Sequence, residues 1–309
     1  MKEFKTIDEQ IDKLLEKELI IDDIETTKSI LEFENYYNLI NGYKELFTCK
    51  YSEKEKFIKD THFNEVYAVY NFDSNIRSIF MKYILKCENY IKSKIIYTFC
   101  YNHREKDYVK IENFNNTNDK KIKYINKLIN DINLDVERQT VNKKGMLIHY
   151  KENYDYIPLW VVSIILTFGK TSKFYELMKN KEQCQISKSF KLFPEHLIRY
   201  LNSLTLIRNI CAHSERLYNF KYRNRIKDID IHEKLNITKE KGNYICGTND
   251  LFSIVIILKK LLKNNEFKYF FKELQKEINI LKGILSETDM KKLYNNMGFP
   301  HNYMNIQYL

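Results

Sequence analysis

Residues 63–99 read FNEVYAVYNFDSNIRSIFMKYILKCENYIKSKIIYTF and contain neither glycine nor proline. Apolar side chains recur in this stretch every three or four residues, at Val66, Val69, Tyr70, Ile76, Phe80, Ile84, Cys87, Ile91 and Ile95. This spacing places them on one face of an α-helix. The stretch therefore predicts one long helix, or two nearly continuous ones. Asp73 and Arg77 are expected to pair on its surface because they lie one helical turn apart.

Helical patterns also occur before and after this stretch. Thr6 to Glu9 has the form of a capping box, and Asp22 or Asp23 can cap a second helix. Further helices are expected from Pro158 to near Gly169, from Pro194 to Cys211, and at about 250–263 and 266–282. The chain has only 7 glycine and 3 proline residues, too few for the many tight turns of a β fold. The sequence thus predicts an all-α protein.

We interpret residues 1–309 as a single domain. Its N-terminal helices are expected within 1–50, its core at 51–225 with a polar excursion at about 104–145, and a C-terminal helical extension at 226–309. The excursion carries no pattern that assigns it a role. The aromatic-rich stretch at 36–43 is interpreted as part of the core, because aromatic side chains at such density are more often buried than exposed.

The chain is basic, with a net charge of +10 at pH 7, which suits a polyanionic partner such as nucleic acid or an anionic membrane. A compositional bias toward lysine is an equally good explanation of the charge alone. Arginine is more informative, because only eight of the 51 basic residues are arginine and five of those eight lie between positions 199 and 225. A guanidinium holds phosphate in a fixed, bidentate geometry. RNA contacts are therefore expected from Arg199, Arg216, Arg223 and Arg225.

Several classes of protein are not indicated. The six cysteines are scattered without a Cys-x-x-Cys pair, so neither a zinc site nor a disulfide framework is expected. The N-terminus lacks an apolar signal core. The longest apolar run, Leu251 to Leu262, is interrupted by Lys259 and Lys260 and is too short to span a bilayer. We expect a cytoplasmic protein without a metal, a cofactor or a membrane partner.

The most informative motif is at residues 206–213, which read LIRNICAH. Asn209 and His213 share a helix face, whereas Arg208 lies about 140° away around a regular helix. The three converge only if the helix ends or kinks here, or if a second subunit closes the site. On spacing alone, a helix-end pair that merely binds an ion is an alternative. The similar spacing of Arg225 and His232 lies among carboxylates and is interpreted as chance.

These side chain types suit cleavage of RNA by its own ribose 2′-hydroxyl. A histidine, with an ordinary pKa of about 6.5, can accept the 2′ proton or donate a proton to the departing 5′-oxygen. An arginine can stabilise the charge on the phosphorane. One histidine cannot readily serve as base and acid in the same step. We therefore expect a two-fold homodimer in which His213 of each subunit faces a shared cleft.

The wider string at 206–219 resembles the Arg-Asn-x-Cys-Ala-His-x-x-Arg-Leu-Trp-Asn pattern of the Abi-like family of phage-defence proteins. Other blocks that resemble the family follow in its order, at 10–23, 35–43, 70–77, 158–160, 168–169 and 297–300. There are departures from the pattern. Tyr218 stands where tryptophan is common, Lys92 follows Glu88 where arginine is expected, and Ser214 occupies a position often held by histidine.

The resemblance implies an α-helical HEPN fold, RNA cleavage and abortive infection of phage-infected bacteria. The family's catalytic arginine, its polar neighbour and its histidine correspond to Arg208, Asn209 and His213, and its trailing arginine to Arg216. Several relatives are toxins restrained by a partner, and in the AbiF branch a small noncoding RNA is a candidate. The prediction is a metal-independent endoribonuclease toxin. A non-catalytic RNA-binding scaffold that uses the same arginines is the alternative.

Overall fold

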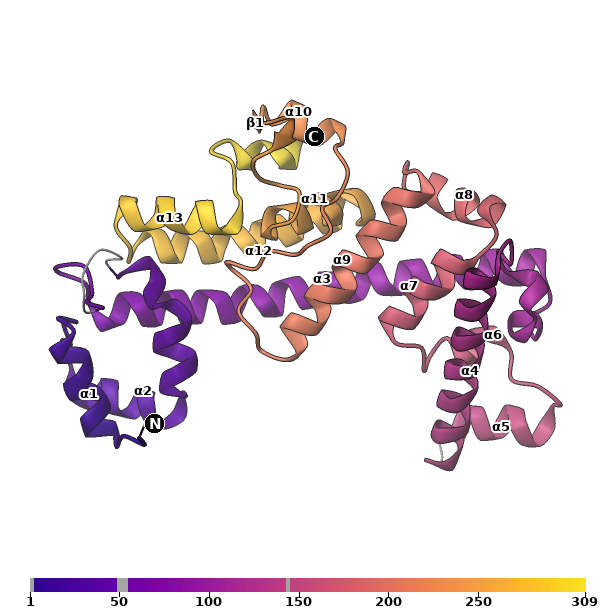
Figure 1. The fold of residues 1–309 in the computed structure, drawn as a ribbon, viewed down its shortest axis with the longest axis horizontal. Helices are drawn as coiled ribbons and strands as arrows, with labels where there is room; N and C mark the ends of the chain where they lie inside the picture. Colours follow the sequence, from indigo (N-terminus) through magenta and orange to yellow (C-terminus); the bar gives the residue numbers. More distant parts are fainter. Residues whose placement is uncertain (1–2, 49–54, 143–144) are drawn as a thin grey trace.

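A helix of 40 residues organises the molecule. The computed structural model describes residues 3–48, 55–142 and 145–309. The helix α3 (Phe63–Asn102) extends along most of the length of the molecule (Figure 1). A helix of 40 residues is about 60 Å long. At its start, the backbone N–H of His62 donates to the Glu65 carboxylate at 2.8 Å. The helix continues without a break, so the first of the two predicted alternatives, one long helix, is confirmed.

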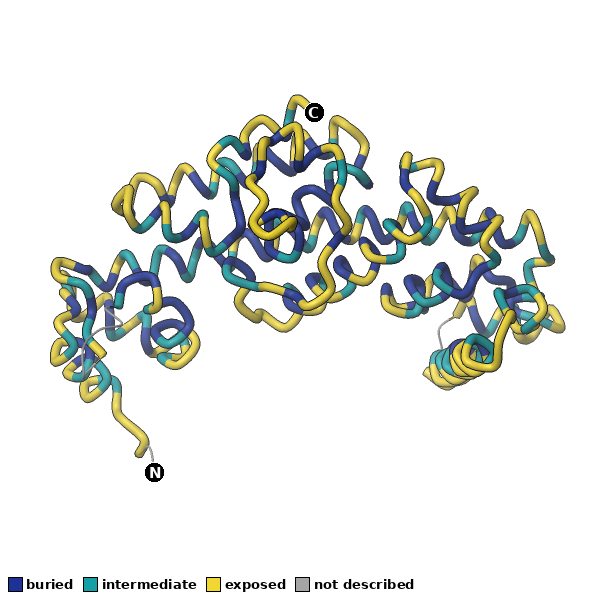
Figure 2. Tube along the Cα trace, turned by 45° about the horizontal axis from the view of Figure 1, so that its top comes forward, coloured by how far each residue is buried: buried dark blue, intermediate teal, exposed yellow. Residues whose placement is uncertain are grey.

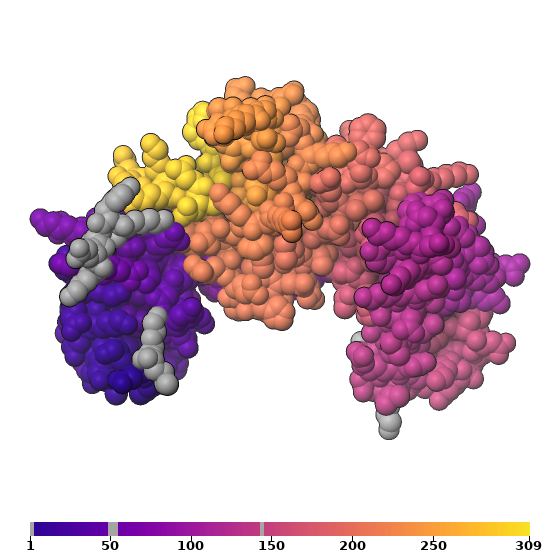
Figure 3. Space-filling view, viewed as in Figure 1, coloured from indigo at the N-terminus to yellow at the C-terminus, as the bar shows by residue number. Residues whose placement is uncertain are grey.

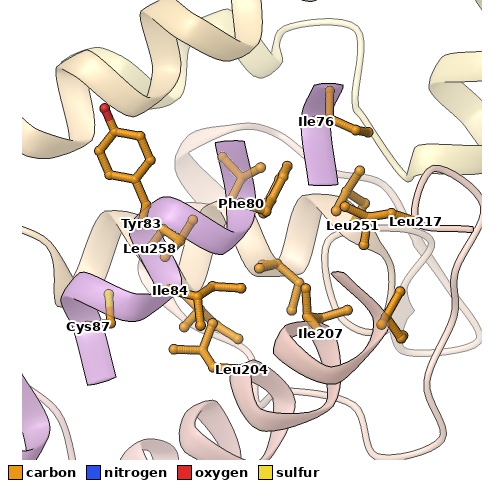
Figure 4. Packing of buried hydrophobic residues seen from close by; sticks show 14 of the residues in the cluster. Ile76, Phe80, Tyr83, Ile84, Cys87, Leu204, Ile207, Leu217, Leu251 and Leu258 are labelled. Atoms are coloured by element: carbon orange, nitrogen blue, oxygen red, sulfur yellow. The ribbon is translucent and has the colours of Figure 1, made fainter. Parts of the chain in front are cut away.

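The core lies where three other helices pack against α3. They are α9 (Pro194–Ala212), α11 (Leu251–Leu261) and α12 (Asn264–Lys282). Ile76 and Phe80 of α3 are fully buried in the same cluster as Leu204 and Ile207 of α9 and Leu258 of α11 (Figure 4). Burial of one such side chain contributes about 1.5–3 kcal/mol. The apolar stripe that predicts α3 is thus the face that α3 turns toward this core.

Two short helices and two single turns precede α3. They are α1 (Ile7–Glu16), α2 (Ile24–Phe33), the π-helical turn η1 (Tyr37–Asn41) and the 3-10 turn η2 (Lys44–Leu46). Thr6 caps α1 within a capping box, and Asp23 caps α2, as the sequence predicts. The expectation that the stretch at 36–43 is core is right for Tyr43, which is buried, and wrong for Tyr37, which is exposed.

A second group of helices lies at the far end of α3. It comprises η3 (Asp107–Val109), η4 (Ile111–Asn113), α4 (Asp119–Val141), α5 (Gly145–Asn153), α6 (Leu159–Val162), α7 (Phe168–Leu177) and α8 (Asn180–Lys188). The polar excursion predicted at 104–145 is mostly α4, which packs against α7. Only Ile125, Leu128 and Ile132 of this 23-residue helix are buried. Such a narrow apolar stripe explains why the segment has a polar composition although it is helical.

The helix expected from Pro158 to Gly169 is in fact two helices. α6 ends at Val162, and α7 begins after its N-cap Thr167, whose hydroxyl accepts the N–H of Lys170. Gly169 therefore lies in the first turn of a helix and not at the end of one. Thr167 satisfies a free N–H of the new helix, as an N-cap does, and so marks a separate start for α7.

The C-terminal part covers the remaining side of the core. It adds to α11 and α12 the helix α10 (Asp230–Lys234), an antiparallel pair of strands β1 (Lys239–Glu240) and β2 (Asn243–Tyr244), α13 (Glu287–Met297) and the 3-10 segment η5 (Tyr303–Tyr308). Asp250 caps α11 and accepts the N–H of Gly247 at 2.8 Å. Gly298 ends α13 with a φ of 74°, and a Cβ there would lie 2.1 Å from the Asp250 carboxyl group. The helices expected at about 250–263 and 266–282 are confirmed.

The molecule has the shape of an arch. The N-terminal helices and the helices α4 and α5 project to the same side of α3, and the end of α9 lies between them (Figures 1 and 3). Buried residues are most continuous in the middle of the arch, where the helices cross (Figure 2). Apart from one short pair of strands, the regular structure of the described residues is helical, which confirms the all-α prediction. No helix in the described ranges is long and apolar enough to cross a membrane.

Candidate functional site

The motif helix ends at the predicted histidine. α9 is regular to its last residue, and His213 is its C-cap. Ser214 has a positive φ of 56°. Its N–H donates to the Cys211 carbonyl at 3.4 Å, and the N–H of Glu215 donates to the Ile210 carbonyl at 3.1 Å. This pair of bonds forms a Schellman turn, which redirects the chain after His213 and leaves that residue exposed.

A buried carboxylate fixes the backbone that follows this turn. Asp73 of α3 is fully buried and accepts the N–H of Tyr218 at 2.7 Å and that of Leu217 at 3.1 Å. It also pairs with Arg77 and accepts the Tyr43 hydroxyl at 2.7 Å. The predicted pairing of Asp73 with Arg77 is present, but it is buried and not on the helix surface, because the loop after α9 covers it. Burial raises the pKa of Asp73, and the charge of Arg77 opposes that rise.

The loop after α9 is also tied to the turn η1. Arg216 Nη1 donates to the Gly42 carbonyl at 2.8 Å. The ring of Tyr43 stacks on that of Tyr218 with their centroids 5.5 Å apart, and it meets Tyr70 edge-on, also at 5.5 Å. Arg216 and Gly42 are 174 positions apart in the sequence. These contacts hold two distant segments together as opposite walls of one site.

A pocket of about 680 Å³ lies between these walls. Its lining comes from η1 and its neighbours, from α3 and from the loop after α9: Tyr37, Asn38, Asn41, Gly42, Tyr43, Tyr70, Ser74, Arg77, His213, Ser214, Glu215, Arg216, Asn219, Phe220 and Lys221. Three of these side chains are cationic, Arg77, Arg216 and Lys221, whereas Glu215 is the one carboxylate. The lining therefore has a net positive charge that suits a phosphate group.

The predicted catalytic residues do not all line this pocket. His213 lines it, whereas Arg208 and Asn209 do not. Asn209 is exposed, and its carbonyl accepts the N–H of His213 at 2.9 Å. Arg208 is half-buried, and its Nε has no hydrogen-bond partner within the described parts of the chain. Because α9 has no kink, Arg208 and His213 remain on different sides of the helix.

Three of the four predicted RNA-binding arginines line two separate pockets, and Arg225 lines neither of them. Arg216 lines the pocket described above, while Arg199 and Arg223 line another of about 480 Å³ beside the N-terminal half of α9. Arg199 Nη1 donates to the Arg225 carbonyl at 3.0 Å, so it also supports the loop that carries Arg225. Arg223 and Arg225 are exposed. The arginine-rich window thus forms two separate pockets and not a single one.

The sequence reasoning misses the part of the site that α3 contributes. It assigns no functional role to Asp73 or Arg77, although both lie in the block at 70–77. A usable signal is present, because Asp73 lies on the same helical stripe as Val69, Ile76 and Phe80. A charged residue on a buried stripe has to be paired and hydrogen-bonded. Its partners come from a loop that only the folded chain brings to it.

Two other sequence features lie outside the pocket. His232 is fully buried, and its Nε2 lies 2.8 Å from the Gly247 carbonyl, which supports the interpretation of its spacing from Arg225 as chance. Glu88 and Lys92 form an ion pair at 2.8 Å, about 22 Å along α3 from Asp73. Within residues 3–48, 55–142 and 145–309, no group of three or more His, Cys, Asp or Glu side chains is placed to hold a metal ion.

Comparison with known proteins shows the family of this chain. The family model described as Abi-like protein matches residues 29–219, which contain η1, α3, α9 and the turn after α9. No curated protein and no solved structure matches the chain. The matched range covers more than half of the 309 residues and nearly all of the pocket lining. The chain therefore belongs to the Abi-like protein family.

Proposed function

We propose that this Abi-like protein is a metal-independent endoribonuclease toxin of the HEPN type. Membership of the family suggests a role in abortive infection, the defence in which a phage-infected bacterium stops its own growth. The observation that carries the proposal is the composition of the pocket at the end of α9. An exposed histidine, His213, lines it together with two arginines, Arg77 and Arg216, that are held by Asp73 and by the Gly42 carbonyl.

In the proposed reaction the RNA supplies its own nucleophile. The ribose 2′-oxygen forms a bond to the adjacent phosphorus, and the bond from phosphorus to the 5′-oxygen breaks. One proton leaves the 2′-hydroxyl and one is delivered to the 5′-oxygen. His213 carries one of these protons, and Arg216 and Arg77 stabilise the negative charge of the phosphorane. The products are a 2′,3′-cyclic phosphate and a 5′-hydroxyl.

The second proton transfer is assigned to a second subunit. Exposed side chains follow one face of α9, at Asn202, Leu206, Asn209 and His213. Residues at this spacing share a helix face, so two copies of α9 can meet along it around a two-fold axis. Leu206, which is apolar and 40 % exposed, would become buried in that contact. In the proposed homodimer both His213 side chains face one cleft, and Arg208 and Asn209 of both copies flank it.

A toxin of this type needs a restraint before infection. The positively charged lining of the pocket suits a small noncoding RNA that occupies it in a form that cannot be cut. A protein antitoxin would have to present carboxylates or another anionic group to the same lining. We propose the RNA, because one pocket then explains both the substrate and the inhibitor.

The alternative is a non-catalytic RNA-binding scaffold within a defence ribonucleoprotein. It is favoured by the position of Arg208, which does not line the pocket of its own chain. The enzyme is favoured by His213, because phosphate binding needs cations and does not require an exposed histidine beside them.

Expression without a partner, followed by mapping of RNA ends, tests the proposal. His213→Ala is expected to abolish growth arrest and cleavage, and Arg208→Ala is expected to do the same because Arg208 flanks the cleft of the proposed homodimer. His149→Ala is the matched control, because His149 is an exposed histidine on α5 outside the pocket. If folded His213→Ala arrests growth as wild type does, the catalytic assignment is wrong. If neither protein cuts RNA and both bind it equally, the scaffold is the better description.

A further inference from the structure

The pocket at the end of α9 has two chemically different walls. The loop after α9, with α3, supplies the cations and His213. The opposite wall is formed by η1 and is neutral, with Tyr37, Asn38 and Asn41 in its lining. A bound phosphate accounts for the charged wall. It leaves the neutral wall without a ligand.

We propose that Tyr37, Asn38 and Asn41 bind the base of an unpaired nucleotide whose phosphate lies at Arg216 and His213. In this arrangement Tyr37 stacks on the base, and the two asparagine amides bond to its edge. The inference rests on the proposed RNA-cleaving function and adds to it the part of the site that selects the nucleotide. The ligand class is a purine or pyrimidine nucleotide within a single-stranded segment.

Tyr37 has the exposure and the rigid backbone that a stacking surface needs. Its side chain is 70 % exposed, whereas Tyr43 at the other end of the same aromatic stretch is buried. The N–H of Tyr37 donates to Asn35 Oδ1 at 2.8 Å. Leu39 and Ile40, which follow it in the π-helical turn, are both buried. An aromatic ring on a fixed turn offers its face to any base, which is the basis of stacking in single-strand recognition.

The two asparagines have hydrogen-bonding capacity to spare. Asn38 is exposed and Asn41 is half-buried. Neither side-chain amide is engaged with another residue in the described part of the structure. A primary amide has two donors and one acceptor oxygen, which can bond to the edge of an unpaired base. Recognition of unpaired RNA bases commonly combines such contacts with stacking on an aromatic ring.

The separation of the two walls is fixed by the fold. The Gly42 carbonyl, which accepts from Arg216 at 2.8 Å, directly follows η1 in the chain. The phosphate-binding arginine is therefore bonded to the segment that carries the proposed base-binding residues. The pocket volume of about 680 Å³ is within the range of about 300–1,000 Å³ that small-ligand sites occupy. The phosphate and the base of one nucleotide can be held together in it.

The first test measures kcat/KM on a short single-stranded RNA. Tyr37→Ala is expected to lower the value about tenfold or more through the loss of stacking, whereas Tyr37→Phe keeps the ring and is expected to retain it. Tyr269→Ala is the matched control, because Tyr269 on α12 is 63 % exposed and lies outside the pocket. Equal values for Tyr37→Ala and wild type would overturn the stacking role.

The second test reads the base preference of cleavage from the ends of a randomised RNA. Wild type is expected to prefer certain bases beside the cut, and the double variant Asn38→Ala, Asn41→Ala is expected to lose or change that preference. Both positions are accessible to solvent, so this variant is expected to fold. An unchanged preference, or a wild type with none, would overturn the base-reading role of the amides.

Binding separates a failure of this inference from a failure of the proposed function. Calorimetry compares the four nucleoside 3′-monophosphates with inorganic phosphate. Tighter binding of at least one nucleotide than of phosphate, lost in Tyr37→Ala, supports the base-binding wall even if wild type cuts no RNA. Equal affinities for nucleotides and phosphate overturn it. If RNA is cut and Tyr37→Ala behaves as wild type in all three measurements, the cleavage function stands and the base-binding wall does not.

Discussion

The backbone N–H of Tyr218 donates to the carboxylate of Asp73 at 2.7 Å, although the two residues are 145 positions apart. The same carboxylate pairs with Arg77, whose side chain lines the pocket. The buried carboxylate of Asp73 thus fixes both the loop that follows His213 and the cation Arg77, which lines the same pocket as His213. The geometry of the motif on α9 depends on a residue outside the motif.

Removal of the Asp73 carboxylate should therefore destabilise the whole fold. Asp73→Ala leaves Arg77 without its counter-charge and leaves two buried N–H groups without an acceptor, a change that costs about 3–5 kcal/mol. Urea denaturation measures the free energy of unfolding. Asp12→Ala, at an exposed position on α1, should stay within about 0.5 kcal/mol of wild type. An Asp73→Ala protein as stable as wild type would contradict this role.

Cleavage should persist in EDTA and leave 2′,3′-cyclic phosphate and 5′-hydroxyl ends, because the proposed reaction uses side chains and the substrate's own hydroxyl. End-labelling before and after phosphatase treatment identifies the termini. RNA with a 2′-deoxy substitution at the scissile nucleotide should resist, since it lacks the nucleophile. Products with 5′-phosphate ends, or activity that requires Mg²⁺, would show that another mechanism operates.

RNA binding should weaken steeply with salt. Each phosphate neutralised on a single strand contributes about 0.7 to the slope of log K against log salt. Arg216→Ala should reduce the magnitude of that slope by about 0.7, the contribution of one phosphate contact, because Arg216 lines the charged wall. Arg138→Ala is the control, since Arg138 lies on α4 with a side chain that is 69 % exposed. A slope that is the same in wild type and Arg216→Ala would remove Arg216 from the RNA contact.

The homodimer can be tested by mixing differently tagged subunits. If both histidines of a shared cleft are needed, a heterodimer of wild-type and His213→Ala chains should have far less than half of the wild-type activity. The heterodimer is isolated through its two tags and assayed directly. Half activity or more, or full activity in a monomer by light scattering, would show that each chain has a complete site.

The stability of the C-terminal part should depend on pH through Asp250. Burial raises the pKa of this carboxyl from 3.8 to about 6, although the N–H groups of Gly247 and Ser253 oppose the rise. A carboxyl with a higher pKa in the folded state stabilises the fold while it is protonated, and this contribution is lost as the pH rises through about 6. The shift in pKa corresponds to a contribution of about 3 kcal/mol to the free energy of unfolding. The free energy of unfolding of wild type, measured relative to that of Asp250→Asn, should fall by up to this amount between about pH 4 and pH 7. A difference that does not vary with pH would contradict the shift.

The sequence predicts the elements of this fold better than it predicts the pocket. α3 and α9 are predictable because their apolar stripes are long and Pro194 marks the start of α9. α4 is harder to identify, because three buried residues in 23 give too weak a stripe. The spacing of apolar residues shows which face of a helix is buried in the core. It does not show which other helices contact that face.

The candidate site shows the same limit. His213 is identifiable from its motif, since that motif is one continuous stretch of sequence. The pocket around it is built from η1, α3 and the loop after α9, which converge only in the folded chain. The burial of Asp73 depends on Leu217 and Tyr218, far along the chain. The helical stripe marks Asp73 as a charge that must be paired, but no local pattern shows that Asp73 or Tyr37 belongs to this site.

The left-handed backbone of Ser214 limits how this site can evolve. At a φ of 56°, asparagine, aspartate and histidine are tolerated more readily than most residues, and β-branched residues are strongly disfavoured. Histidine is among the residues that the turn accepts, so one substitution can add a second imidazole without rebuilding the helix end. Ser214→His would thus introduce a second proton donor next to His213 in the sequence, while the turn that ends α9 stays unchanged.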